Sequence, residues 1–212
     1  ATDGRSQHAD LTADAHYVVF DSTTTNFASG SINNKSNIFI KDRSNGVLTR
    51  ISNTISNIDG NGDSVNAKIS SSGNFVTFES DASNLSSNDT DNARDIFLWS
   101  KSTNKLLNVD SLIGANSTTF NGLSSYNSDV ADSNGNAIVT FETTKQISRQ
   151  DDIGSSDIYA FYAKDQSFHL VSSDSQGVRL NGYSNNASIS ADGRFVVFTN
   201  SGDNPTLGDS NG

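Results

Sequence analysis

The stretch SISADGRFVVFTN, from Ser188 to Asn200, predicts two short strands joined by a tight turn. Asp and Gly tolerate the positive φ that a two-residue hairpin loop requires, so we expect Asp192-Gly193 to form that loop. The run from Phe195 to Phe198 is aromatic and β-branched, which is typical of a strand on a buried surface. The stretch therefore predicts a hairpin with one buried strand.

The same pattern occurs three more times along the chain. The earlier copies are ADLTADAHYVVFDS (9–22), AKISSSGNFVTFES (67–80) and SDVADSNGNAIVTFET (128–143). A Phe stands at one position of all four copies, as Phe20, Phe78, Phe141 and Phe198, so the spacings are 58, 63 and 57 residues. The chain therefore contains an internal repeat of about 60 residues, the length at which repeat architectures are recognised.

We place the repeats at 6–65, 66–124, 125–184 and 185–212, and the last ends after its first two strands. In each full repeat we expect an inner strand, an apolar strand, an aromatic strand and an outer strand; in the first these are 8–11, 17–21, 37–41 and 48–52. Four-stranded antiparallel units at a fixed period predict propeller blades. Residues 1–212 are thus predicted to be one all-β, propeller-like domain of about three and a half repeats, either open or completed by sequence outside this segment.

Composition excludes several kinds of partner. The formal net charge is −10, whereas affinity for nucleic acid comes from Lys and Arg, so we expect no nucleic-acid partner. There is no Cys, which excludes disulfides and thiolate metal sites. No stretch approaches the roughly 18 apolar residues of a membrane span, so no membrane insertion is expected. The chain begins and ends within the repeat pattern, which predicts that it is part of a longer polypeptide.

The repeat resembles the long version of the TolB-type β-propeller repeat of bacterial envelope and secreted proteins. SISADGRFVVFTN matches the first half of that repeat, and SDASNLSSNDTDNARDIFLWS (80–100) matches the second half. The resemblance covers nearly the whole chain, although Asn37 replaces the Asp of the D-I-F motif in the first repeat. Long repeats of this kind are also similar to segments of large calcium-dependent RTX-type bacterial adhesins. That similarity implies a peptide- or glycan-binding module at the surface of a Gram-negative bacterium.

Acidic loops predict Ca²⁺ as a cofactor, because this hard cation takes oxygen ligands. Asp59, Asn61 and Asp63 place three oxygen side chains on alternate residues of a Gly-rich loop. A second loop carries Asp89, Asp91 and Asp95, and the equivalent region of the third repeat carries Asp151 and Asp157. The alternative is that these residues cap turns through hydrogen bonds from their side chains to the backbone.

The inner strands are the expected ligand-binding surface, because propellers bind partners where these strands converge. The charge varies at one repeat position just before a buried apolar residue: Asp10, Lys68, Asp129 and Ser188. Variation at an equivalent position indicates a surface freed from packing. The predicted ligand-binding residues are Asp10, Asn66, Lys68, Tyr126, Asn127 and Asp129.

Catalysis is not expected. The three His show no metal-ligand spacing, no G-x-S-x-G elbow is present, and Glu79 and Glu142 at equivalent strand ends are predicted to be structural. We therefore expect a calcium-stabilised adhesion module that binds a peptide or glycan on another cell surface and is secreted or attached to the surface. The alternatives are a periplasmic TolB-like protein-interaction scaffold and the non-catalytic propeller portion of a hydrolase.

Overall fold

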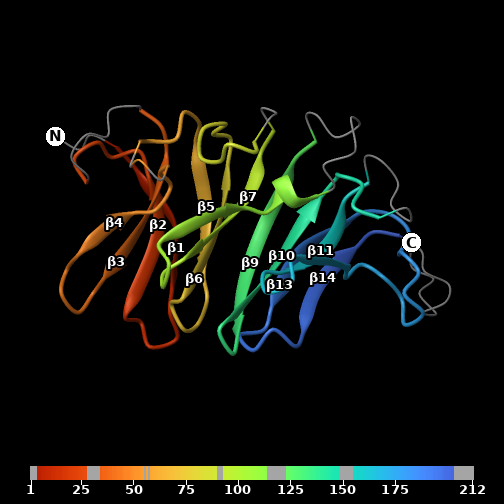
Figure 1. Cartoon of the computed structure of the whole chain (residues 1–212). Helices are drawn as coiled ribbons and strands as arrows, with labels where there is room; N and C mark the ends of the chain where they lie inside the picture. Colours follow the sequence, from red (N-terminus) through yellow and green to blue (C-terminus); the bar gives the residue numbers. More distant parts are fainter. Residues whose placement is uncertain are drawn as a thin grey trace.

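The computed structural model describes residues 4–27, 34–54, 56, 58–89, 93–113, 123–148 and 155–202. These residues form short β-strands and one 3-10 turn, so the predicted all-β class is confirmed. Figure 1 shows the sheets side by side in a row that does not close, with the first unit at one end and the last at the other. The propeller-like array is confirmed in this open form. No helix within these ranges is long and apolar enough to cross a bilayer.

Each full repeat folds into a four-stranded antiparallel sheet, which we call a blade, with its strands in sequence order. The first blade contains β1 (Ser6–Leu11), β2 (Tyr17–Ser22), β3 (Asn37–Asp42) and β4 (Leu48–Arg50). The second contains β5 (Ser64–Ile69), β6 (Phe75–Ser80), β7 (Asp95–Ser100) and β8 (Lys105–Asn108), followed by the 3-10 turn η1 (Asp110–Leu112). The third contains β9 (Ser125–Ser133), β10 (Asn136–Thr143), β11 (Asp157–Tyr162) and β12 (Ser167–Leu170), and the described part of the fourth is the pair β13 (Ser184–Ile189) and β14 (Val196–Asn200).

The hairpin between β13 and β14 is longer than the sequence predicts. The backbone N–H of Gly193 donates to the carbonyl of Ser190, and Ser190 N–H donates to the carbonyl of Phe195, so the predicted two-residue loop at Asp192-Gly193 is wrong. Gly193 alone in that turn has a positive φ, of 75°. A two-residue loop occurs instead in the third blade, where Asn134 and Gly135 both have positive φ, as a type I′ turn requires.

Apolar side chains fill the seams between neighbouring blades. Between the first two blades, Val19, Ile38 and Ile51 share a cluster with Ile69, Phe78 and Phe97. Between the second and third, Ile96, Leu98 and Val109 share one with Val130, Val139 and Phe141. Each buried Phe of these clusters contributes about 1.5–3 kcal/mol relative to an exposed ring. The aromatics Phe78, Phe97, Phe141 and Tyr159, which recur along the repeat, are buried in these clusters and contribute to the core between blades.

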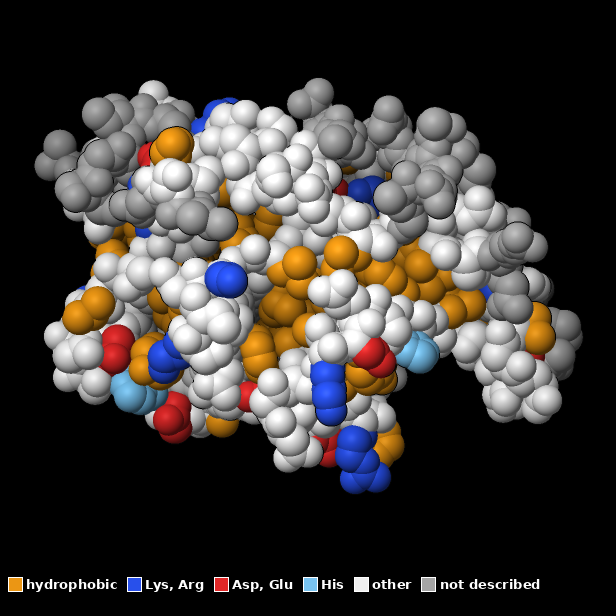
Figure 2. All heavy atoms as spheres, in the orientation of Figure 1, with side chains coloured by type: hydrophobic (Ala, Val, Ile, Leu, Met, Phe, Trp, Pro, Cys, Tyr) orange, Lys and Arg blue, Asp and Glu red, His pale blue; other side chains and the backbone are white. Residues whose placement is uncertain are grey.

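The surface matches the composition. Most of the face in Figure 2 is neither hydrophobic nor charged, as expected from the abundance of Ser, Asn, Thr and Gly. Hydrophobic side chains show mainly in a band across the middle of this face. The narrow apolar stripe on each strand is therefore enough to build the seams, and the rest of each strand remains polar.

Candidate functional site

Each innermost strand carries a β-bulge at the same repeat position. His8, Asn66, Asn127 and Asn186 have φ values of 47°, 57°, 50° and 56°, and strand pairing shifts register beside each of them. A positive φ is uncommon for residues other than Gly, and Asn and His are enriched among the exceptions. Three Asn at equivalent positions were therefore a signal of the bulge, which the sequence analysis missed.

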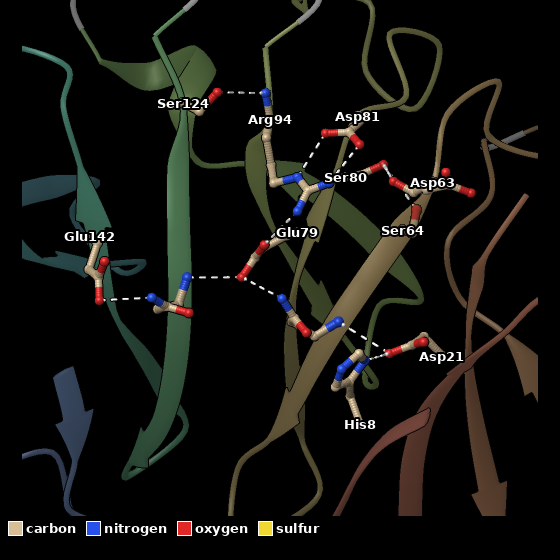
Figure 3. A network of polar contacts seen from close by, with 12 residues as sticks. His8, Asp21, Asp63, Ser64, Glu79, Ser80, Asp81, Arg94, Ser124 and Glu142 are labelled. Atoms are coloured by element: carbon tan, nitrogen blue, oxygen red, sulfur yellow. Dashed lines mark hydrogen bonds and ion pairs between the residues drawn. The ribbon is translucent and has the colours of Figure 1, made fainter. Parts of the chain in front are cut away.

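A buried carboxylate holds each bulge in place and joins it to the next blade. At the seam between the second and third blades, Glu79 Oε1 accepts a hydrogen bond from Asn66 Nδ2 in its own blade at 3.1 Å. The same oxygen accepts a bond from the backbone N–H of Asn127 in the following blade at 2.9 Å (Figure 3). Hydrogen bonds to a charged group contribute about 1.5–3 kcal/mol each, so one side chain of Glu79 stabilises both the bulge and the seam.

The same arrangement occurs at the other two seams. The acceptors are Asp21 at the first seam and Glu142 at the third. His8 Nδ1 lies 2.7 Å from Asp21 Oδ1, which also accepts the N–H of Asn66, and Glu142 Oε1 accepts Asn127 Nδ2 at 2.9 Å and the N–H of Asn186. All three carboxylates are buried. We call Asp21, Glu79 and Glu142 together the carboxylate ladder. Within it, Glu79 and Glu142 join neighbouring blades, which is a structural role.

Arg94 balances the charge of the ladder at its middle seam. Its guanidinium donates two hydrogen bonds to Asp81, at 2.8 and 2.7 Å, and one to Glu79 Oε2 at 3.3 Å (Figure 3). The hydrogen bond with Asp81, and after it the charges of Asp81 and Glu79, raise the pKa of Arg94 above its ordinary value. Arg94 therefore stays charged beside the buried Glu79, which reduces the cost of burying that carboxylate.

The four bulges surround one cavity of about 400 Å³. Its walls are the bulge segments of all four blades: His8 and Ala9, 66–68, 127–129 and 186–188. Lys68 is exposed in this cavity, and among the described residues its ammonium group has no ion-pair or hydrogen-bond partner. Asp129 lines the same space from the next blade. The inner cavity therefore has a polar wall with one unpaired cation.

The structure brings together four of the six predicted ligand-binding residues. Asn66, Lys68, Asn127 and Asp129 line the inner cavity, whereas Asp10 and Tyr126 are not among its lining residues. Whether these residues bind a ligand stays a prediction.

Two of the predicted ligand-binding residues, Asp10 and Asp129, also form hydrogen bonds between blades. Asp10 Oδ2 accepts the N–H of Ile69 at 3.0 Å, and Asp129 Oδ2 accepts the N–H of Ile189 at 3.0 Å. Each carboxylate therefore crosses a seam to the next inner strand. Lys68 holds the equivalent position at the middle seam and cannot accept such a bond.

The first predicted calcium loop makes contacts within the protein. Asp59 Oδ1 lies 2.5 Å from Arg50 Nη2, Asn61 Oδ1 accepts the N–H of Ser83 at 2.9 Å, and Asp63 Oδ1 accepts the N–H of Ser36 at 2.7 Å. These oxygens face three different donors instead of one common point. The described contacts are an ion pair with Arg50 and hydrogen bonds from the backbone of two other segments, and calcium binding by Asp59, Asn61 and Asp63 stays a prediction.

Two other predicted calcium ligands pair with buried cations. Asp95 Oδ1 lies 2.8 Å from Lys145 Nζ, and Asp157 Oδ2 accepts a bond from Arg179 Nε at 2.7 Å. Lys145 also contacts Asp110 Oδ1 at 2.7 Å, so it bridges two carboxylates.

Burial, and then the charge of Asp110, raise the pKa of Asp95 above its ordinary value. Burial alone would lower the pKa of Lys145, but the charges of Asp110 and Asp95 outweigh it and the net shift is upward. Within the described ranges, no three His, Asp or Glu side chains form a group that could hold a metal ion. Asp89 lies at the edge of a described range, and Asp91 and Asp151 lie outside them. Calcium binding in those two loops stays a prediction.

Comparison with known proteins identifies the fold. No family model matches the chain, and no curated protein matches its sequence. Among solved structures it is similar to TolB from Acinetobacter baumannii, with 16% identity and a TM-score of 0.53 over 92% of this chain and 37% of TolB. It is also similar to the tricorn protease, with 12% identity and a TM-score of 0.52 over 92% of this chain and 15% of that one. The chain thus spans well under half of either structure, and at these identities the likeness shows a TolB-type propeller fold.

Proposed function

We propose that the chain is a non-catalytic binding module that docks a peptide segment of a protein partner in the inner cavity. The observation that carries this proposal is the unpaired Lys68 in a cavity walled by the bulges of all four blades. An ammonium group in such a place attracts a carboxylate, either an acidic side chain or a chain terminus. Asp129 on the next blade would repel the same group, so the acidic group of the peptide is expected on the Lys68 side.

The lining favours a peptide over a glycan. None of the described residues of the cavity wall is Phe, Tyr or Trp, the large aromatic side chains that stack on a sugar ring. The wall consists of Asn, Ala, Ser, one His, Lys68 and Asp129, which offer small surfaces and hydrogen-bonding groups. This chemistry suits an extended peptide with polar backbone groups. The proposal follows the scaffold alternative, and TolB-like propellers suggest a periplasmic or extracellular location.

The test is selection of peptides from a random decapeptide library with the full chain as bait. We expect peptides with an acidic side chain or a free terminal carboxylate, and at least tenfold weaker binding by Lys68→Glu. Lys105→Glu is the matched control, because Lys105 is exposed on the outer strand β8 and makes the same charge change. Selection that fails, or binding that Lys68→Glu leaves unchanged, contradicts the proposal.

Calcium-stabilised adhesion is a more specific form of this function and rests on the acidic loops that contain Asp89 and Asp151. Its test is thermal unfolding with millimolar Ca²⁺ and again with EDTA. A ligand that binds only the folded state stabilises it by about 2.7 kcal/mol at a hundredfold excess over Kd. Adhesion predicts a rise of several degrees with Ca²⁺, whereas superimposable curves leave the peptide-binding scaffold without a calcium site.

A further inference from the structure

The first blade exposes an apolar position that the second and third blades bury. Leu11 on β1 is 54% exposed, whereas its equivalents Ile69 on β5 and Val130 on β9 are 6% and 5% exposed. Ile69 and Val130 are covered because each lies in the seam with the preceding blade. Further out on the same face, Phe27 packs edge-on against Phe39 with ring centroids 5.6 Å apart. The open part of this face is therefore the surface of β1.

The opposite end of the row exposes the complementary position. Val197 on β14 is 68% exposed, whereas its equivalents Val19, Thr77 and Thr140 on the second strands of the other blades are fully buried. Those three are covered by the seam with the following blade. Phe195, which directly precedes this strand, is 63% exposed. The two ends of one chain thus carry the two unmatched halves of a seam.

The two described strands of the fourth blade are enough to receive an inner strand. In each seam the innermost strand of one blade lies mainly on the first two strands of the preceding blade: β5 on β1 and β2, β9 on β5 and β6, and β13 on β9 and β10. The pair β13 and β14 is the equivalent of those first two strands. It therefore presents most of the surface on which an innermost strand rests.

The polar contacts can also be extended to this end. At the existing seams, buried carboxylates such as Glu79 accept the N–H of the next bulge, and Asp10 or Asp129 accepts the N–H of the next apolar residue. Thr199 and Ser188 hold these two positions in the fourth blade, and their hydroxyl oxygens can accept the same bonds. His8 on β1 already has the positive φ of the incoming bulge.

We propose that two copies of this chain associate head to tail, with β1 of one copy resting on β13 and β14 of the other. Leu11 of one copy would then cover Val197 of its neighbour, as Ile69 covers Val19 inside the chain. We choose a second copy as the partner because the repeat shows that an innermost strand covers the surface of β13 and β14. Each copy has both an exposed innermost strand, β1, and an exposed receiving pair. Such a contact joins two different patches, so it is heterologous.

The test is sedimentation velocity of the full chain over a range of concentrations. We expect the wild type to self-associate, and Leu11→Lys and Val197→Lys each to lose this association, since each removes one half of the seam. Both positions are exposed in the single copy, so the variants are expected to stay folded, and circular dichroism checks this. Val47→Lys is the matched control, because Val47 is 55% exposed at the β3–β4 turn, on the far side of the sheet from β1.

Mixing the two variants distinguishes a heterologous seam from other modes of self-association. The Leu11→Lys variant keeps an intact β14 surface and the Val197→Lys variant keeps an intact β1, so an equimolar mixture should regain association through one seam. Pairing of two β14 edges with each other would instead leave Leu11→Lys associating like the wild type. That result contradicts the proposal. A wild type that is monomeric at every soluble concentration also contradicts it, and so does a mixture that stays monomeric.

Discussion

The carboxylate of Glu79 accepts a hydrogen bond from the N–H of Asn127 at 2.9 Å and thereby joins the second blade to the third. Replacing Glu79 with Ala removes this acceptor and leaves the N–H of Asn127 and the amide of Asn66 without their partner, while Arg94 keeps only Asp81. We expect a loss of about 3 kcal/mol in the free energy of unfolding, measured with urea. Lys105→Ala, at an exposed position of the outer strand β8, is the control and should change stability by about 0.5 kcal/mol or less. Equal losses in the two variants would contradict the role of the ladder.

Lys145 neutralises two buried carboxylates, so Lys145→Met should be strongly destabilising. Asp95 and Asp110 would remain buried without a cation, and breaking a buried ion pair in this way costs about 3–5 kcal/mol. Urea unfolding at pH 7 measures this loss. A loss below about 1 kcal/mol would show that the two carboxylates are stabilised by their other partners.

The contribution of Lys145 should disappear at high pH. The pKa of Lys145 is raised in the folded state above its ordinary value of 10.5, so its contribution is complete below pH 10.5 and is lost as pH rises above that value toward the folded pKa. The difference in unfolding free energy between the wild type and Lys145→Met should therefore shrink above pH 10.5. Taking the difference removes the titration of Tyr and the other Lys, which both proteins share. A constant difference would contradict this linkage.

Ser44 should set the acidity of Asp42. The pKa of Asp42 is lowered to about 2, chiefly by the side-chain hydrogen bond from Ser44 at 2.6 Å; the N–H of Ser44 and His16 also lower it, and desolvation opposes them. The effect on stability is present above the ordinary pKa of 3.8 and is lost as pH falls toward 2. A ¹³C titration of the Asp42 carboxyl should show a pKa near 2 in the wild type and a higher one in Ser44→Ala. An unchanged midpoint would contradict the assignment.

Ala15 occupies a turn position that is Gly in two other blades. Its φ is 56°, and the equivalents Gly73 and Gly193 have 76° and 75°. A residue with a Cβ pays about 1–2 kcal/mol in this conformation, partly offset by the greater freedom of Gly in the unfolded chain. We expect Ala15→Gly to stabilise by up to about 1 kcal/mol and Gly73→Ala to destabilise by more, since its Cβ would lie 3.0 Å from Tyr17. Thermal unfolding of the two variants, which should move in opposite directions, checks this.

Much of the fold could be predicted because the repeat carries its own signals. A turn followed by an apolar strand that contains a Phe recurs in every copy, so the strand order follows from local chemistry. The surface position of Lys68 was also predictable, since its charge differs from that of its equivalents. What the sequence could not show is pairing over distance. Lys145 meets Asp95 from 50 residues away, and nothing near either residue indicates the other.

The acidic loops illustrate the same limit. Asp59 and Asp157 have the spacing and composition of calcium ligands, yet each lies beside an Arg, 2.5 and 2.7 Å away, that comes from another segment. Carboxylates that bind a cation and carboxylates that pair with a guanidinium are alike in sequence. Only the position of the partner distinguishes them.

The arrangement of the blades in a row determines which strands unfold first. Apart from its hairpin partner β14, β13 has its main described contacts with strands of the third blade, and β14 is a partly exposed apolar strand. A chain in which each unit touches only its neighbours loses structure from its ends inward. Backbone amides of β14 should therefore exchange with deuterium first, those of β2 later, and those of β6 and β10 last. Hydrogen exchange along the chain would then report the strength of each seam in turn.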